Sequence, residues 1–184
     1  MTPYIRTFSG HRFDVKPTPD QVYLEDIAVA LSRLPRFMGH STFPYSVAAH
    51  CLYVCALSPP RLKLQALFHD ASEAYIGDMP SPFKALMPDY KKVEEDIMVA
   101  VAERFGFTLP IDPLVKSADQ YALYKERMEL FSLSSQKDAE CIPAVPAPAT
   151  IEWDFQFVSG LHPDHLAARF IARARFLVTH MYES

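Results

Sequence analysis

The chain has 184 residues, of which 49% are hydrophobic and 22% are charged, proportions typical of a globular protein and too mixed for a disordered or collagen-like one. Its formal net charge is −4 and it contains no run of Lys and Arg, so binding to duplex nucleic acid is disfavoured. No stretch approaches the roughly 20 apolar residues that cross a membrane, and residues 1–10 lack the apolar centre of a signal peptide. We therefore expect a cytoplasmic protein with no membrane contact.

A chain of this length is expected to form a single domain over residues 1–184. Its core is expected at about 20–131, followed by a Pro-rich connector at 132–163 and a C-terminal helix at 164–182. The cysteines are Cys51, Cys55 and Cys141. Their odd number, in a chain large enough to fold without disulfides, is consistent with reduced thiols.

Apolar residues that recur at spacings of three and four predict an all-α fold. Prolines and glycines separate the predicted helices, which cover residues 22–34, 45–57, 61–75, 90–105, 112–131 and 164–182. The third of these is expected to end near Gly77, with His69 and Asp70 in its last turns. Residues 78–89 contain three prolines and are expected to form an ordered loop.

The connector is rich in Pro, Ser and Ala and is longer than most loops in a compact domain. A lid, an interface arm and a disordered loop all remain open for it. Together with the apolar face of the last helix, Trp153, Phe155 and Phe157 offer surface that a small bundle does not fully cover. We therefore expect a homodimer or a higher homo-oligomer.

The strongest local signal is the string HDASEAYIGD at residues 69–78, which places five ionisable or metal-binding groups in ten positions. Burying so many such groups is costly unless they have a role. On a helix, Glu73 follows His69 by four residues and Asp70 by three, so all three side chains can face one pocket. Imidazole and carboxylate are ordinary ligands for divalent metals.

Two more polar residues, His50 and Asp119, lie on the apolar faces of separate predicted helices. An isolated buried His or Asp is more often a hydrogen-bonded core residue than a ligand. The order His50, His69, Asp70, Asp119 is much harder to explain by accident. It predicts one divalent metal ion held by four ligands, with Mn, Co, Zn, Fe and Mg all compatible.

This order resembles the H…HD…D pattern of the HD superfamily of metal-dependent phosphohydrolases. The likeness is greatest to the small bacterial and phage 5′-deoxynucleotidases, which show strings similar to HDASEAYIGDMPSPFK at 69–84 and VKSADQYALY at 115–124. It includes the pair Arg36-Phe37 ahead of His50, and it extends from the first helix to Glu129. The resemblance implies an all-α HD-domain helical bundle and a divalent-metal-dependent phosphohydrolase.

In such a site the metal activates a water molecule and offsets phosphoryl charge. The resemblance implies that Glu73 and Asp78 orient the water or transfer a proton to the leaving oxygen. Arg36 and Lys116 are cations suited to hold phosphate oxygens, and Phe37 is suited to stack on a base or sugar.

Each of these residues also has a structural alternative. Arg36 at a helix end suits the last carbonyls of that helix, Phe37 suits the core, and Lys116 suits a solvated surface. Glu73 and Asp78 suit capping or structural pairing.

We therefore expect removal of phosphate from deoxynucleoside 5′-monophosphates. A triphosphohydrolase that cleaves dNTPs is the main alternative, and extra cations near the pocket would favour it; the candidates are Arg33, Lys84, Lys91 and Lys92. A catalytically idle nucleotide-binding module and a cyclic- or signalling-nucleotide phosphodiesterase are further alternatives. In each case the partner is a small-molecule nucleotide.

Overall fold

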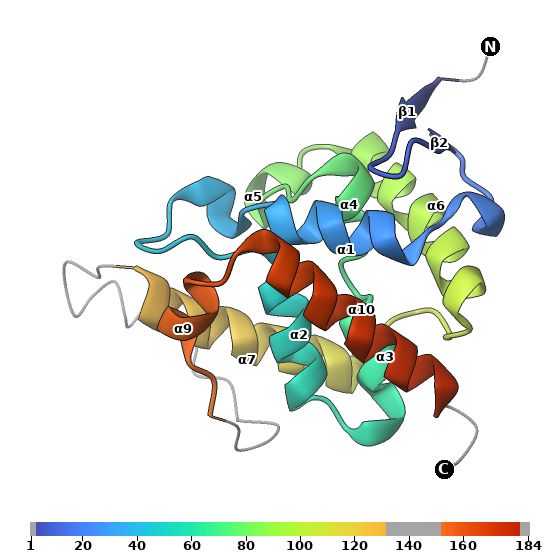
Figure 1. Cartoon of the computed structure of the whole chain (residues 1–184). Coiled ribbons are helices and arrows are strands. Elements are labelled where there is room, and N and C mark those ends of the chain that lie inside the picture. Colours follow the sequence, from blue (N-terminus) through green and yellow to red (C-terminus); the bar gives the residue numbers. More distant parts are fainter. Residues whose placement is uncertain (1–2, 132–151, 181–184) are drawn as a thin grey trace.

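A computed structural model of the protein describes residues 3–131 and 152–180. Apart from one small hairpin, the regular structure in these ranges is helical (Figure 1), which confirms the expected all-α bundle. The α-helices are α1 Leu24–Arg33, α2 Val47–Leu57, α3 Lys63–Leu67, α4 Glu73–Ile76, α5 Ser81–Lys84, α6 Pro88–Phe105, α7 Pro113–Leu130, α9 Phe155–Ser159 and α10 Pro163–Thr179. Short 3-10 helices lie at Pro19–Gln21, Arg36–Gly39 and Pro60–Leu62.

Helix α2 is the centre of the bundle. It packs against α1, α3, α7 and α10, and nine of its eleven residues are buried, as expected for a helix that is apolar on all sides. The Ser46 side chain caps its start by accepting from the Ala49 N–H, and the helix ends ahead of Pro59 and Pro60. A histidine in such a helix is necessarily removed from water.

Helix α10 closes the bundle by lying along α1 and reaching α2 and α3 (Figure 1). It buries an apolar stripe that includes Phe170. The Phe170 ring meets Phe68 edge-on at a centroid distance of 5.6 Å, and Phe68 stacks on Phe105 at 4.3 Å. These rings join α10 to α6 through the segment that follows α3.

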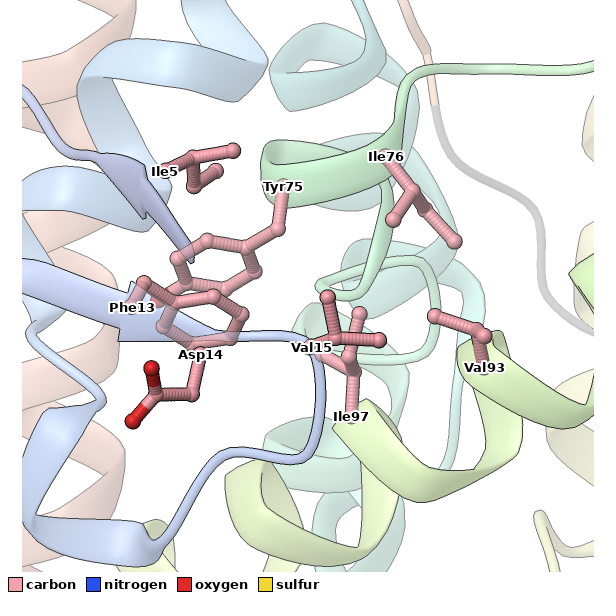
Figure 2. Close-up of a pocket in the computed structure, with 8 residues that line it drawn as sticks. All are labelled: Ile5, Phe13, Asp14, Val15, Tyr75, Ile76, Val93 and Ile97. Atoms are coloured by element: carbon pink, nitrogen blue, oxygen red, sulfur yellow. The ribbon is translucent and has the colours of Figure 1, made fainter. Parts of the chain in front are cut away.

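A two-stranded antiparallel hairpin precedes the bundle and was not predicted. Its strands are β1 Tyr4–Arg6 and β2 Arg12–Asp14. The Asp26 carboxylate of α1 holds its turn, accepting from the Ser9 N–H at 2.7 Å and the Ser9 hydroxyl at 2.8 Å. Figure 2 shows the Phe13 and Tyr75 rings face to face, and their centroids are 3.6 Å apart. The hairpin is thereby fixed onto α4.

The third predicted helix, 61–75, is broken, and the expectation that His69 and Asp70 lie in a helix is wrong. The chain leaves α3 after Leu67 and enters α4 only at Glu73. Between them each backbone N–H bonds to the carbonyl three residues earlier instead of four, as the Ala71 N–H does with the Phe68 carbonyl. The Ala66 carbonyl accepts instead from Nδ1 of His69 at 2.8 Å. A side-chain donor thus takes an acceptor that a continuing helix would use.

The remaining differences are smaller. The predicted loop at 78–89 contains the single turn α5. Within the predicted connector, residues 132–151 and with them Cys141 lie outside the described residues, whereas residues 155–159 form α9. Helix α10 ends at Thr179, and residues 181–182 of the predicted last helix are also outside the described ranges.

None of the described helices is both long and apolar enough to span a membrane. The apolar face of α10, from which an oligomer was expected, packs largely against the chain's own helices. Phe157 and Phe176 nevertheless remain more than half exposed. The homo-oligomeric state and the cytoplasmic location both stay predictions.

Candidate active site

Three segments of the bundle bring the predicted metal ligands together. His50 comes from α2, His69 and Asp70 from the turn after α3, and Asp119 from α7. Nε2 of His50 lies 3.2 Å from Nε2 of His69, 3.1 Å from Oδ1 of Asp119 and 3.5 Å from Oδ2 of Asp70. The four side chains therefore point at one place.

Hydrogen bonds to the Nδ1 atoms of His50 and His69 determine whether their Nε2 atoms, which face the cluster, carry a proton or a lone pair. Nδ1 of His69 must carry a proton, because its partner, the Ala66 carbonyl, only accepts. Nδ1 of His50 lies 2.7 Å from a carboxylate oxygen of Glu126, which accepts in the same way. In the neutral rings, both Nε2 atoms consequently carry lone pairs.

Two lone pairs 3.2 Å apart, flanked by two carboxylates, make a site that requires positive charge. Burial disfavours a charged ring, yet Asp70 and Asp119 hold the pKa of His69 well above its usual value. Ligands bound to one ion at about 2.1 Å lie roughly 3.0 to 3.4 Å apart. The distances around Nε2 of His50 are 3.1 to 3.5 Å, and Nε2 of His69 lies 3.2 Å from Oδ2 of Asp70 and 3.8 Å from Oδ1 of Asp119. Most of these distances are close to that range, so the cluster is a candidate site for a single divalent ion.

The site is buried on one side and open on the other. The His50 side chain is fully buried, whereas the side chains of Asp70 and Asp119 are 23% and 41% exposed. The open side of the cluster is therefore the side of the two carboxylates.

Glu73 and Asp78 lie beside this cluster, with Glu73 in the first turn of α4. Burial, reinforced by the negative charges of Asp70 and Asp78, raises the pKa of Glu73 to about 10. Its Oε2 atom is buried without a hydrogen-bond partner among the described residues. Burial also raises the pKa of Asp78. The protonated form of Glu73 suits proton donation.

The backbone between these two acids has a conformation that favours glycine. Gly77 ends α4 at φ 86° and ψ 161°, a region that residues with a side chain rarely occupy. The Tyr90 hydroxyl donates to the Gly77 carbonyl at 2.6 Å. This bond joins the start of α6 to the turn that leads into Asp78.

Of the three predicted substrate contacts, Arg36 contacts a member of the cluster. Its side chain is buried, and Nη1 is 3.9 Å from Oδ2 of Asp70. Phe37 has the left-handed φ of 54° and meets Phe131 edge-on at 5.0 Å. Lys116 is exposed on α7, where no described carboxylate forms an ion pair with it.

Glu126 is the site residue that the sequence reasoning missed. It is fully buried on α7 and bonds His50 with one oxygen and Arg36 with the other, at 2.9 Å from Nη2. It follows Asp119 by seven residues, which is two helical turns, so both side chains lie on the same face of α7. That spacing was the one available signal.

Comparison with known proteins gives some relatives that match over most of the chain and others that match over less than half of it. An uncharacterized protein, YfdR, of Escherichia coli K12 is 37% identical over 171 residues, which are 92% of this chain and 93% of that protein. An uncharacterized protein of Rhodobacter capsulatus is 35% identical over 161 residues, covering 79% of this chain and 82% of the relative. A 5′-deoxynucleotidase of Pectobacterium atrosepticum is 34% identical over 89 residues, or 46% of this chain and 43% of that enzyme.

Residues 40–133 match the family described as YfbR-like 5′-deoxynucleotidases. This range contains the four predicted metal ligands, together with Glu73 and Asp78. The resemblance to HD-type nucleotide phosphohydrolases is thereby confirmed at the level of the family. The chain belongs to the YfbR-like 5′-deoxynucleotidase family of enzymes.

Proposed function

We propose that this protein removes phosphate from deoxynucleoside 5′-monophosphates with the help of one divalent metal ion. The proposal rests above all on the convergence of His50, His69, Asp70 and Asp119, whose nitrogen and carboxylate oxygen atoms lie 3.1 to 3.8 Å apart in the contacts between them. Several relatives that match over part of the chain are named 5′-deoxynucleotidases. Their name supplies the substrate class.

When bound by these four side chains, a divalent ion supplies Lewis acidity that activates water and offsets phosphoryl charge. The chain's own acids divide the proton transfers. Glu73 keeps its proton at neutral pH because burial and two neighbouring carboxylates raise its pKa to about 10, so we assign it donation to the leaving oxygen. Asp78, on the far side of Gly77, is assigned to orient the attacking water and to accept the proton that this water loses.

The cations favour a monophosphate over a triphosphate. Among the four extra cations that would suit a triphosphate, Lys84 contacts a site residue, with Nζ 3.9 Å from Oε1 of Glu73. Its charge is already balanced by Glu94 at 2.6 Å. Arg33 pairs with Asp164 at 3.8 Å. Lys91 and Lys92 are exposed on α6, which carries none of the proposed site residues, whereas Lys116 shares α7 with Asp119. Arg36 and exposed Lys116 remain the proposed contacts to a single phosphate.

Release of inorganic phosphate from a panel of dNMPs, NMPs and dNTPs, with Mn²⁺, Co²⁺, Zn²⁺ or Mg²⁺, tests this function. The wild type should release phosphate from dNMPs, and Asp70→Ala and Asp119→Ala should each abolish the release. Gln120→Ala is the matched control, since Gln120 is the exposed neighbour of Asp119 on α7. It should leave turnover unchanged.

The panel also separates the alternatives. Triphosphate released from dNTPs would support the triphosphohydrolase instead. Tight nucleotide binding without turnover under any metal would support a binding module, and the assignment of Glu73 and Asp78 would then be wrong.

A further inference from the structure

From the contacts of Glu126 we infer that it is a positioning residue for the metal site, which sets the tautomer of His50 and, through Arg36, the place of Asp70. This inference rests on the proposed metal-dependent function. Glu126 does not point its carboxylate at the cluster of ligand atoms. Both of its oxygens are used one layer further out, on His50 and Arg36.

The burial of Glu126 is the first observation. Its side chain is 0% exposed, and burying a carboxylate costs several kcal/mol unless its oxygens are paired. Here both are paired: Oε1 lies 2.7 Å from Nδ1 of His50, and Oε2 lies 3.1 Å from Nε and 2.9 Å from Nη2 of Arg36. An apolar residue would fill this place without that cost. The presence of a carboxylate is therefore explained by its contacts with His50 and Arg36.

The second observation is the side of the imidazole that Glu126 occupies. A neutral imidazole has one N–H, and the carboxylate accepts it from Nδ1. The lone pair of His50 is then on Nε2, 3.1 Å from Asp119 and 3.2 Å from His69. A carboxylate behind a ligating histidine both orients the ring and raises its basicity. Helix α7 thereby provides one proposed ligand, Asp119, and the group that orients another.

Arg36 extends the network to the third proposed ligand. It presents Nε and Nη2 to Glu126 and leaves Nη1 3.9 Å from Oδ2 of Asp70. The guanidinium is therefore held between two carboxylates, and its charge offsets both. Loss of Glu126 would release Arg36 towards Asp70 as well as freeing the ring of His50.

The loop that carries Arg36 is fixed to the same helix. The Thr42 N–H and hydroxyl both donate to the Leu130 carbonyl at the end of α7, at 2.7 and 2.8 Å. At the base of the loop, the Arg36 N–H donates to the Tyr45 carbonyl at 2.8 Å. Arg36 is thus held at its backbone and at its side chain, which keeps its geometry towards Glu126 constant.

The test is the affinity for Co²⁺ of Glu126→Gln, measured by chelator competition and accompanied by the visible absorption spectrum of the bound ion. The substitution keeps the size of the side chain, but its amide N–H₂ faces either His50 or Arg36. We expect affinity to fall by about 10- to 100-fold, with a changed spectrum. Glu129→Gln, the same change on the same helix at a side chain that is 49% exposed, should retain wild-type affinity.

If the Glu126–Arg36 ion pair is only structural, Glu126→Gln would lower the melting temperature without altering Co²⁺ affinity or spectrum. That result overturns the inference. Equal losses in Glu126→Gln and Glu129→Gln overturn it too. If Glu126→Gln does not fold, Glu126→Asp keeps the charge but withdraws the carboxylate by about 1.5 Å. Its Co²⁺ affinity must also fall, and wild-type affinity refutes the role. A wild type that binds no divalent ion would instead refute the proposed function itself.

Discussion

Glu73 is a buried acid that the fold favours in its protonated form, so replacing it should separate stability from activity. Burial and the neighbouring Asp70 and Asp78 raise its pKa from 4.5 to about 10. The folded protein therefore retains a proton that the unfolded chain releases above pH 4.5, and this difference costs stability as the pH rises. Glu73→Gln removes the titration but closely matches the shape of the protonated acid. We expect the variant to lose phosphate release and to gain stability at neutral pH.

The magnitude follows from the interval over which the proton is retained. Each pH unit is worth about 1.4 kcal/mol. Between pH 4.5 and pH 7 the wild type therefore loses at most about 3.4 kcal/mol of stability through Glu73, which is the largest gain that Glu73→Gln can show. The nearby Lys84, 3.9 Å from Oε1, favours the ionised form and reduces this. A gain of about 1 to 2 kcal/mol raises the melting temperature of a protein of this size by roughly 2 to 8 °C.

The assay is calorimetric melting of chelator-treated wild type and Glu73→Gln over a pH series. The difference in melting temperature should be near zero at the acid end of the series, close to pH 4.5, and should grow as the pH rises towards 9. Glu95→Gln, an exposed change on α6, controls for the loss of one negative charge and should show no such trend. A Glu73→Gln protein that is no more stable than wild type at pH 8 would refute the reasoning.

Three further predictions concern the metal, the turn and the core. Addition of Mn²⁺ or Co²⁺ at 100 times its dissociation constant should stabilise the protein by about 2.7 kcal/mol, a rise of roughly 5 to 11 °C in scanning fluorimetry; a similar rise in Asp119→Ala would contradict the ligand assignment. Gly77→Ala meets no atom within 4 Å of the new Cβ, so its cost is backbone strain of about 1 to 3 kcal/mol, accompanied by reduced phosphate release because Asp78 is displaced. Phe68→Ala removes a fully buried ring that stacks on Phe105. It should lower the free energy of unfolding in urea by about 3 to 5 kcal/mol. A loss below about 1 kcal/mol would argue against the packing described.

Apolar periodicity predicted the long helices well. The spacing of Val93, Ile97 and Val101 placed a helix at 90–105, and α6 covers Pro88–Phe105. Periodicity says nothing about the break after α3, since that break depends on a side-chain hydrogen bond from His69. The hairpin was also beyond it, because strands of three residues are too short to show alternation. Contacts distant in sequence, such as Ser9 with Asp26, hold that hairpin in place.

The site was predictable where residue type alone is unusual. A histidine in the apolar segment of α2 and an Asp among the apolar residues of α7 stand out against their neighbours, and the structure brings both to His69 and its neighbour Asp70. Glu126 does not stand out, because Lys125, Arg127 and Glu129 surround it in sequence and resemble a solvated helix face. Its burial depends on the loop that brings Arg36 over α7, a tertiary contact that no local pattern contains.

The position of α10 also has a consequence for how the protein is made. Every residue of the proposed site, from Arg36 to Glu126, is synthesised before α10 leaves the ribosome. Until Phe170 arrives, the side of α1 that α10 covers and the edge of the Phe68 ring face water. A nascent chain at that stage exposes an apolar strip, which is the kind of surface that chaperones bind and that leads to aggregation. The apolar strip on α1 and Phe68 is therefore covered only after α10 has been translated.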